Sequence, residues 1–203
     1  MNSRIIGIIV LTAFLAVLGA SGAHAQSAVP DRYDDIFRKY AKRYFGPGFD
    51  WRVFKAQSMT ESNLNPDATS WVGARGLMQL MPSTYAEIRS RNPEMGEIND
   101  PEWNIAAGIF YNRQLWRQWE GRVDLRDRPE FMFGSYNAGR ATILRAQKLA
   151  TVKSLDARIW PSIRNVAPDV RGWRHEETLD YVLRIDASLE RMNDKGRIIK
   201  KRQ

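Results

Sequence analysis

The chain of 203 residues has no cysteine and two histidines, His24 and His175. Without cysteine, a thiol nucleophile, a thiolate zinc site and a disulfide framework are all excluded. Two histidines cannot form a cluster of imidazole metal ligands. A Ser-His-Asp triad would depend on His175, and no Gly-x-Ser-x-Gly turn accompanies that residue. We therefore interpret His175 as a surface or helix-capping residue.

Strand patterns are also scarce, and the apolar residues recur with helical spacing along most of the chain. We expect a mainly α protein with at most a small β-element near Ser70–Leu80. Capping residues support several boundaries: Asp50 and Asp100 are good N-caps, and Pro101 suits the first turn of a helix. The expected helices cover 33–44, 51–61, 82–91, 101–120, 129–138, 141–150 and 173–192.

The first 25 residues have the pattern of a secretory signal peptide. Arg4 precedes the apolar stretch Ile5–Ala20, and Ala23-His24-Ala25 is a small-x-small cleavage site. The alternative is an uncleaved membrane anchor, although the apolar stretch is short for a spanning helix. Because no cysteine follows the site, a lipoprotein anchor is excluded. We expect an exported, periplasmic protein whose mature chain begins at Gln26.

Beyond the signal peptide at 1–25, the organisation that we expect is simple. It comprises a helical extension at 26–48, one compact domain at 49–192 and a basic tail at 193–203.

Positive charge predominates, with 31 Lys and Arg against 23 Asp and Glu. No zinc finger, RNA-recognition motif or glycine-rich phosphate loop accompanies this charge, so we expect no nucleic-acid partner. Basic residues are concentrated at the C-terminal end, which we interpret as a frayed, solvated tail capable of weak contact with a membrane or cell wall. They are Lys195, Arg197, Lys200, Lys201 and Arg202.

Glu61 is the strongest candidate for acid chemistry. It lies at the expected C-terminal end of an apolar helix, where the helix dipole disfavours an anion. Burial among Phe54, Met59, Leu64 and Met78 would also raise the pKa of its carboxyl group. A Glu that retains its proton near neutral pH suits general-acid cleavage. A solvated glutamate at a helix end is the competing interpretation.

Four short motifs follow one another from Glu61 onward. They are Glu61-Ser62, Gly76-Leu77-Met78-Gln79, Tyr136-Asn137-Ala138-Gly139 and Glu177-Thr178-x-x-Tyr181-Val182. In this order and at these separations, the chain resembles the catalytic domain of the soluble lytic transglycosylases, which has a goose-type lysozyme-like fold. The resemblance covers approximately 49–189. One departure is Ser135, where the family often has alanine.

The resemblance implies a role for each matching residue. Glu61 corresponds to the single catalytic acid. Ser62, Met78, Gln79, Tyr136 and Asn137 correspond to substrate-binding residues, and Glu177 and Tyr181 to structural support of the cleft. The implied substrate is the glycan strand of peptidoglycan, and the implied reaction needs no cofactor and no metal. Glu61 would protonate the MurNAc–GlcNAc β-1,4 linkage and then act as a base, leaving a 1,6-anhydro-MurNAc end without consuming water.

Two alternatives remain open at this point. A hydrolytic muramidase would pair Glu61 with a second carboxylate, and Asp67 is within reach in sequence, although it is also a natural turn residue. A non-catalytic peptidoglycan-binding module would bind without cleavage. Among the seven tryptophans, Trp71 lies in a glycine-flanked loop beside the motif and is the candidate for a sugar-stacking platform.

Overall fold

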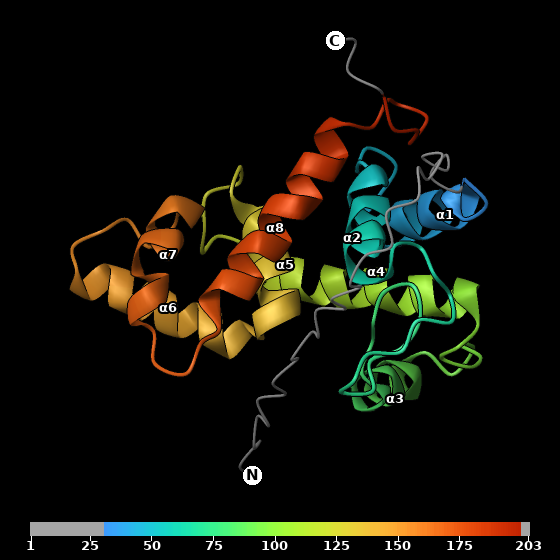
Figure 1. The fold of residues 1–203 in the computed structure, drawn as a ribbon, viewed down its shortest axis with the longest axis horizontal. Helices are drawn as coiled ribbons and strands as arrows, with labels where there is room; N and C mark the ends of the chain where they lie inside the picture. Colours follow the sequence, from blue (N-terminus) through green and yellow to red (C-terminus); the bar gives the residue numbers. More distant parts are fainter. Residues whose placement is uncertain (1–30, 200–203) are drawn as a thin grey trace, which may run out of the picture. The chain divides into compact units, whose positions relative to one another are not determined.

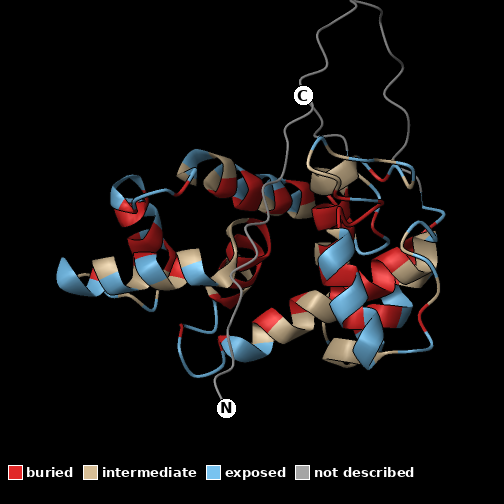
Figure 2. Ribbon diagram, turned by 90° about the horizontal axis from the view of Figure 1, so that it is seen from below, coloured by how far each residue is buried: buried red, intermediate tan, exposed pale blue. Residues whose placement is uncertain are grey.

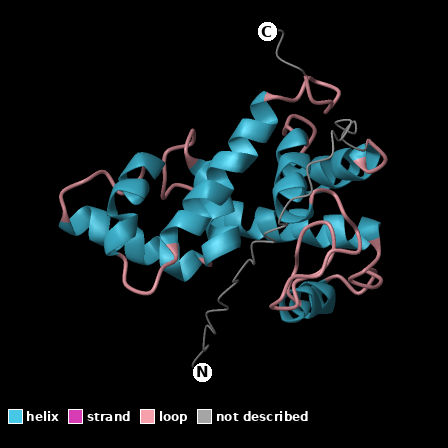
Figure 3. Cartoon of the chain, viewed as in Figure 1, coloured by secondary structure: helices cyan, strands magenta, loops and turns pink. Residues whose placement is uncertain are grey.

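The computed structural model describes residues 31–199. The expected signal peptide and the residues Lys200, Lys201 and Arg202 lie outside this range. Within it, the chain forms eight α-helices and one short 3-10 helix, with no β-strand (Figure 3). In chain order they are α1 (Asp34–Phe45), α2 (Arg52–Ser62), α3 (Pro82–Arg91), α4 (Pro101–Gln118), α5 (Arg128–Ala138), α6 (Arg140–Val152), α7 (Trp160–Val166), η1 (Ala167–Asp169) and α8 (His175–Glu190) (Figure 1).

The mainly α prediction is confirmed, and the expected β-element is reduced to isolated pairs. Two antiparallel bridges join Thr69 to Arg75 and Arg75 to Leu80. The helix α7 and the turn η1 were not expected from the sequence. Both have proline in their first turn, where its fixed φ is favourable and its missing N–H has no cost.

Backbone contacts divide the described chain into two compact units. We call residues 31–110 together with 184–199 the Glu61 unit, and residues 111–183 the Tyr136 unit. The helices α4 and α8 each contribute residues to both. Most helices carry both buried and exposed residues, as amphipathic helices do (Figure 2).

In the Glu61 unit, α1 packs against α2. Phe37 and Phe54 are fully buried between them, and Phe54 also contacts Phe45 and Phe49, with ring centroids 5.1 and 5.5 Å apart. The two helices are also joined by an ion pair: the Nζ of Lys55 lies 2.7 Å from a carboxylate oxygen of Asp34, and both side chains are almost completely buried. The helix that ends at Glu61 and Ser62 is therefore anchored by apolar contacts and a buried ion pair.

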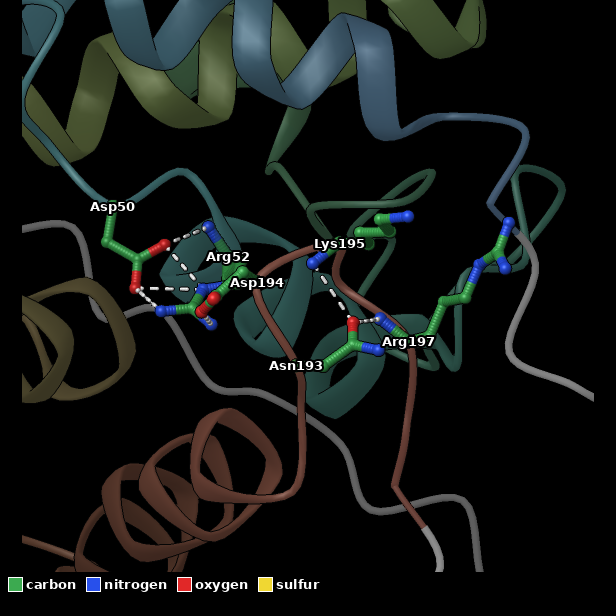
Figure 4. A network of polar contacts seen from close by, with 6 residues as sticks. All are labelled: Asp50, Arg52, Asn193, Asp194, Lys195 and Arg197. Atoms are coloured by element: carbon green, nitrogen blue, oxygen red, sulfur yellow. Dashed lines mark hydrogen bonds and ion pairs between the residues drawn. The ribbon is translucent and has the colours of Figure 1, made fainter.

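Residues 193–199 are ordered, which corrects the expectation of a frayed tail over this stretch. The Asn193 side chain accepts hydrogen bonds from the backbone N–H groups of Lys195 and Arg197, and Asp194 pairs with Arg52 at the start of α2 (Figure 4). Gly196 is buried directly against the Trp51 ring, where an added Cβ would lie 2.4 Å from a ring carbon. The Lys195 and Arg197 side chains are exposed, as expected for solvated residues, but the long-range contacts that hold their backbone leave no local pattern in the sequence.

In the Tyr136 unit, α6 packs against both α5 and α7. Gly134 in α5 allows close approach of the Trp160 ring, because a Cβ there would lie 2.4 Å from a ring carbon. Trp160 also meets Phe131 edge-on, with ring centroids 5.3 Å apart. The backbone N–H of Trp160 donates a hydrogen bond to the Asp127 carboxylate. The start of α7 is therefore fixed both by ring packing and by this hydrogen bond.

In the part of the chain from 31 to 199, no helix is long and apolar enough to cross a membrane.

Candidate active site

Glu61 lies in the last turn of α2 and is partly buried. No basic residue occupies that turn, so no side chain of the turn offsets the negative end of the helix dipole. Phe54, Leu64 and Met78 are buried as expected, whereas Met59 is partly exposed. The carboxyl group therefore lies at the margin of an apolar core rather than within it.

The segment after Gly76 is tied to the end of α2 by two serine hydroxyl groups. Ser58 and Ser62 each donate to the backbone carbonyl oxygen of Leu77 at 2.9 Å. Ser58 is fully buried and Ser62 is partly exposed. Ser62 thus fixes the backbone beside Glu61 against the Gly76–Gln79 motif.

Asn104 in α4 also holds the Gly76–Gln79 motif in place. Its side-chain oxygen accepts from the Met78 N–H at 2.8 Å, and its amide group donates to the carbonyl oxygens of Arg75 and Ile98. Gly76 makes this possible, since a Cβ there would lie 2.4 Å from the Asn104 amide nitrogen. Asn104 is 1% exposed and its three bonds are buried or part-buried, which makes it an anchor of the loop.

Met78 and Gln79 are both buried, with 0% and 6% of their surfaces exposed. Met78 packs on Gly108, where an added Cβ would lie 2.7 Å from the Met78 Cβ. The Gln79 amide donates to the carbonyl oxygens of Ala68 and Gly76 at 3.1 and 2.9 Å. These contacts support the loop itself, and direct contact of either side chain with a glycan stays a prediction.

Backbone strain is concentrated beside Glu61. Of the four non-glycine residues with positive φ between 31 and 199, three are Asn63, Leu64 and Gln79. Such conformations cost roughly 1–3 kcal/mol each and persist only where the surroundings impose them. Here Leu64 is fixed by burial and Gln79 by its two side-chain hydrogen bonds. Strain of this kind is typical of functional sites.

The Tyr136 unit carries the remaining candidates. Tyr136 and Asn137 lie in the last turn of α5 and are 2% and 3% exposed. The Tyr136 ring contacts that of Tyr111, with centroids 5.2 Å apart. Gly139, at φ 78°, ends the helix directly afterwards.

Ser135, the departure from the family pattern, has a structural explanation. Its hydroxyl oxygen accepts from the indole N–H of Trp119 at 3.0 Å. Trp119 is fully buried, and a buried indole N–H requires a hydrogen-bond partner. Alanine at this position would leave that donor unsatisfied unless the tryptophan were also replaced.

Glu177 and Tyr181 lie in the first half of α8. A Glu177 carboxylate oxygen lies 3.4 Å from the Arg174 guanidinium, and Tyr181 is 2% exposed. Thr178, between them, accepts from the indole N–H of Trp173 at 3.0 Å. These contacts agree with a supporting role, which stays a prediction.

Sequence reasoning did not identify the anchoring roles of Ser58 and Asn104. For Asn104 a signal was available in the sequence. Asparagine has a low helix propensity, and no local feature explains its position inside an apolar helix, one turn before Gly108. At Gly108 the helix is closely approached by the Met78 side chain. No cluster of three acidic or histidine side chains suited to a metal ion occurs among residues 31–199.

A family model described as the transglycosylase SLT domain matches residues 35–159. The chain belongs to this family. The matched range includes Glu61, Met78 and Tyr136, while Glu177 and Tyr181 lie beyond it. The family expected from the sequence is thereby confirmed.

Relatives of this SLT domain are longer proteins. The chain is 35% identical over 159 residues to membrane-bound lytic murein transglycosylase F of Stutzerimonas stutzeri, an alignment covering 75% of this chain and 30% of that protein. Among solved structures, the 70 kDa soluble lytic transglycosylase of Escherichia coli superposes with a TM-score of 0.59 at 26% identity, over 80% of this chain and 24% of that one. A soluble lytic transglycosylase of the same size in complex with bulgecin A gives 0.61 at 27% identity, over 85% and 26%. The chain therefore spans less than a third of the length of these relatives.

Proposed function

We propose that this protein is a peptidoglycan lytic transglycosylase in which Glu61 acts first as an acid and then as a base. The observation that carries the proposal is the setting of Glu61 within the family-matched segment. It occupies a helix C-terminus without a basic residue in its last turn, and Ser62 and Asn104 hold the neighbouring motif in place. The name of the Stutzerimonas stutzeri relative, a lytic murein transglycosylase, points to the same substrate.

The reaction needs one carboxyl group and no water. Protonated Glu61 donates its proton to the oxygen that links MurNAc to GlcNAc, and the bond from C1 of MurNAc to that oxygen breaks. The N-acetyl group of the MurNAc residue stabilises the cationic C1. The Glu61 carboxylate then takes the proton of the C6 hydroxyl, whose oxygen bonds to C1 and closes the 1,6-anhydro ring.

The other site residues have proposed roles around this step. Each of the two units has residues to which we assign glycan binding: Ser62, Met78 and Gln79 in the Glu61 unit, and Tyr136 and Asn137 in the Tyr136 unit. In this proposal Met78 and Gln79 contact the glycan, in addition to supporting the loop in which they lie. Glu177 and Tyr181 give structural support to the cleft.

We also propose that the chain is exported, with its signal peptide cleaved after Ala25, and acts in the periplasm. The N-terminal pattern supports export, and the Stutzerimonas stutzeri relative is named as a membrane-bound lytic murein transglycosylase. Weak contact of the basic tail with a membrane or the wall fits the positive charge of 197–203. N-terminal sequencing of the mature protein tests the cleavage position.

Mass spectrometry of muropeptides released from purified sacculi tests the activity. We expect products one water lighter than the hydrolysed sugars, and none from Glu61→Gln, which keeps the shape of the side chain but not its acid. Asp67→Asn is the matched control, because Asp67 is exposed and lies in a turn closed by the Asn65 side chain.

The alternatives give different products. Full-mass reducing ends, lost in Asp67→Asn, would indicate a hydrolase with a second carboxylate. Binding to sacculi without release of any product would indicate a binding module. Substantial turnover by Glu61→Gln would contradict the assignment of Glu61.

A further inference from the structure

Trp71 is the one exposed tryptophan among the seven, all of which lie within residues 31–199. Its surface is 72% exposed, whereas Trp119, Trp160 and Trp173 are 0–9% exposed. An indole is the largest apolar side chain and normally contributes buried area to a core or an interface. Trp71 makes no such contribution within its own chain.

The loop that presents Trp71 is closed by hydrogen bonds on both sides. Ser70 N–H donates to the Ala74 carbonyl oxygen and Gly73 N–H to that of Ser70, both at 2.9 Å. The Ala74 N–H donates in addition to the Ser70 hydroxyl oxygen at 2.9 Å. Gly73, at φ 86°, closes the turn. Since its backbone is fixed before any ligand arrives, Trp71 loses less conformational entropy on binding than a side chain on a flexible loop.

The same loop is connected to the candidate acid. Thr69 bridges to Arg75 and Arg75 to Leu80, which makes the Trp71 turn continuous with the Gly76–Gln79 motif between α2 and α3 (Figure 1). The backbone carbonyl oxygen of Leu77 in that motif accepts a hydrogen bond from the hydroxyl group of Ser62, the neighbour of Glu61. The exposed ring and the acid therefore belong to one hydrogen-bonded assembly within the Glu61 unit.

The surroundings of Trp71 combine an apolar face with polar groups. Thr69 and Arg75, paired at the base of the turn, are both exposed. Among the described residues, no carboxylate is paired with the exposed Arg75 side chain. A pyranose ring has an apolar C–H face and a rim of hydroxyl and amide groups, which matches a turn that carries an exposed indole, a hydroxyl group and a guanidinium group.

We propose that Trp71 forms a saccharide subsite, on which an N-acetylated sugar of the β-1,4-linked glycan stacks while the reacting linkage lies at Glu61. This inference rests on the proposed function and adds to it a binding residue that belongs to none of the four motifs. Trp71 takes part in binding and not in proton transfer, so its loss affects binding much more than the chemical step.

Titration calorimetry with a β-1,4-linked GlcNAc hexasaccharide tests the subsite in the Glu61→Gln background, where no cleavage interferes. We expect Trp71→Ala to raise Kd about tenfold, as for a tryptophan at the centre of a binding surface. Trp71→Phe retains a ring and raises Kd by less than about threefold. Leu125→Ala, which removes an equally exposed apolar side chain from the Tyr136 unit, leaves Kd unchanged.

Kinetics with intact Glu61 supply the second measurement. On soluble glycan strands we expect Trp71→Ala to raise KM about tenfold and to change kcat less than twofold. The Tm of Trp71→Ala equals that of the parent, because an exposed side chain contributes little to packing.

The possible outcomes separate the two proposals. An unchanged Kd and KM for Trp71→Ala, in a protein that binds and cleaves glycan, overturns the subsite and leaves the proposed function standing. A fall in kcat with unchanged KM also overturns it, because a stacking platform acts on binding. A parent protein that neither binds the hexasaccharide nor releases muropeptides overturns both.

Discussion

The Ser62 hydroxyl group lies 2.9 Å from the carbonyl oxygen of Leu77 and donates to it. Ser58, one turn earlier in α2, donates to the same oxygen at 2.9 Å. A carbonyl oxygen has two lone pairs and accepts both. The end of α2 is therefore joined to the Gly76–Gln79 motif by two bonds that share one acceptor, so that either can remain when the other is lost.

This shared acceptor predicts a non-additive pair of substitutions. We expect Ser62→Ala to lower the free energy of unfolding by about 0.5–1 kcal/mol and the buried Ser58→Ala by about 1–2 kcal/mol. The double variant, which leaves the Leu77 oxygen without either hydroxyl, loses more than the sum by about 0.5 kcal/mol or more. Urea unfolding of the four proteins measures the cycle. Additivity within about 0.3 kcal/mol would show that the two bonds act independently.

Gly108 provides a test of the packing beneath Met78. Replacing glycine by alanine inside a helix normally stabilises by about 1 kcal/mol. At Gly108 the new Cβ would lie 2.7 Å from the Met78 Cβ and Cγ, atoms close to the backbone that cannot move aside alone. We therefore expect a net loss of about 1–3 kcal/mol and reduced muropeptide release, because displacement of Met78 also shifts its neighbour Leu77.

Gly48→Ala is the matched control for this substitution. A Cβ added at Gly48 would have no atom within 4 Å, and the residue has no positive φ. We expect its Tm and activity to stay close to those of the parent in thermal unfolding and muropeptide assays. A Gly108→Ala protein as stable as Gly48→Ala would contradict the close packing against Met78.

Local signals were sufficient for most helices. Asp100 caps α4 as expected, since its carboxylate accepts from the N–H groups of Glu102 and Trp103. The expected bounds of the helix at Pro82–Arg91 match those of α3. The helix α7 was missed because seven residues are too few to display a 3.6-residue period, although the Trp160-Pro161 pair is a helix-start signal.

The parts of the site that depend on contacts between residues far apart in the sequence could not be predicted. The position of Glu61 at a helix end was readable, because helix periodicity and the Asn65-Pro66 turn are local features. The hydrogen bond from Trp119 to Ser135 joins two helices and leaves no local pattern. The same holds for the burial of Gln79 and for its hydrogen bond to the carbonyl oxygen of Ala68, 11 residues earlier in the chain.

The buried pair of Lys55 and Asp34 predicts a large asymmetry between single and double substitutions. Burial raises the pKa of Asp34, and the adjacent Lys55 opposes that shift. Lys55→Met would leave the carboxylate buried without its partner, for which we expect a loss of about 3–5 kcal/mol at neutral pH. Lys55→Met with Asp34→Asn removes the charge as well and should recover most of that loss. Urea unfolding measures the free energy of unfolding of the single and the double variant. Equal losses in both would show that packing of the lysine stem dominates.

Asp186 in α8 gives the protein a pH-dependent stability of a defined sign. Burial, together with the nearby carboxylate of Glu190, raises its pKa from 3.8 to about 6. Between these values the folded state retains a proton that the unfolded chain has released. Folding therefore becomes less favourable as the pH rises through this window, and the full cost is present above pH 6.

Asp186→Asn removes this cost and should stabilise the protein at pH 7 but not at pH 4. A two-unit shift corresponds to roughly 3 kcal/mol for a fully buried group. Because Asp186 is only partly buried, we expect a gain of about 1 kcal/mol after allowance for solvent screening. Urea unfolding from pH 4 to pH 7.5 measures it, and Glu190→Gln, which removes only the secondary cause, should give a smaller gain. A variant less stable than the parent at pH 7 would show that the ionised Asp186 contributes a favourable interaction that outweighs its burial.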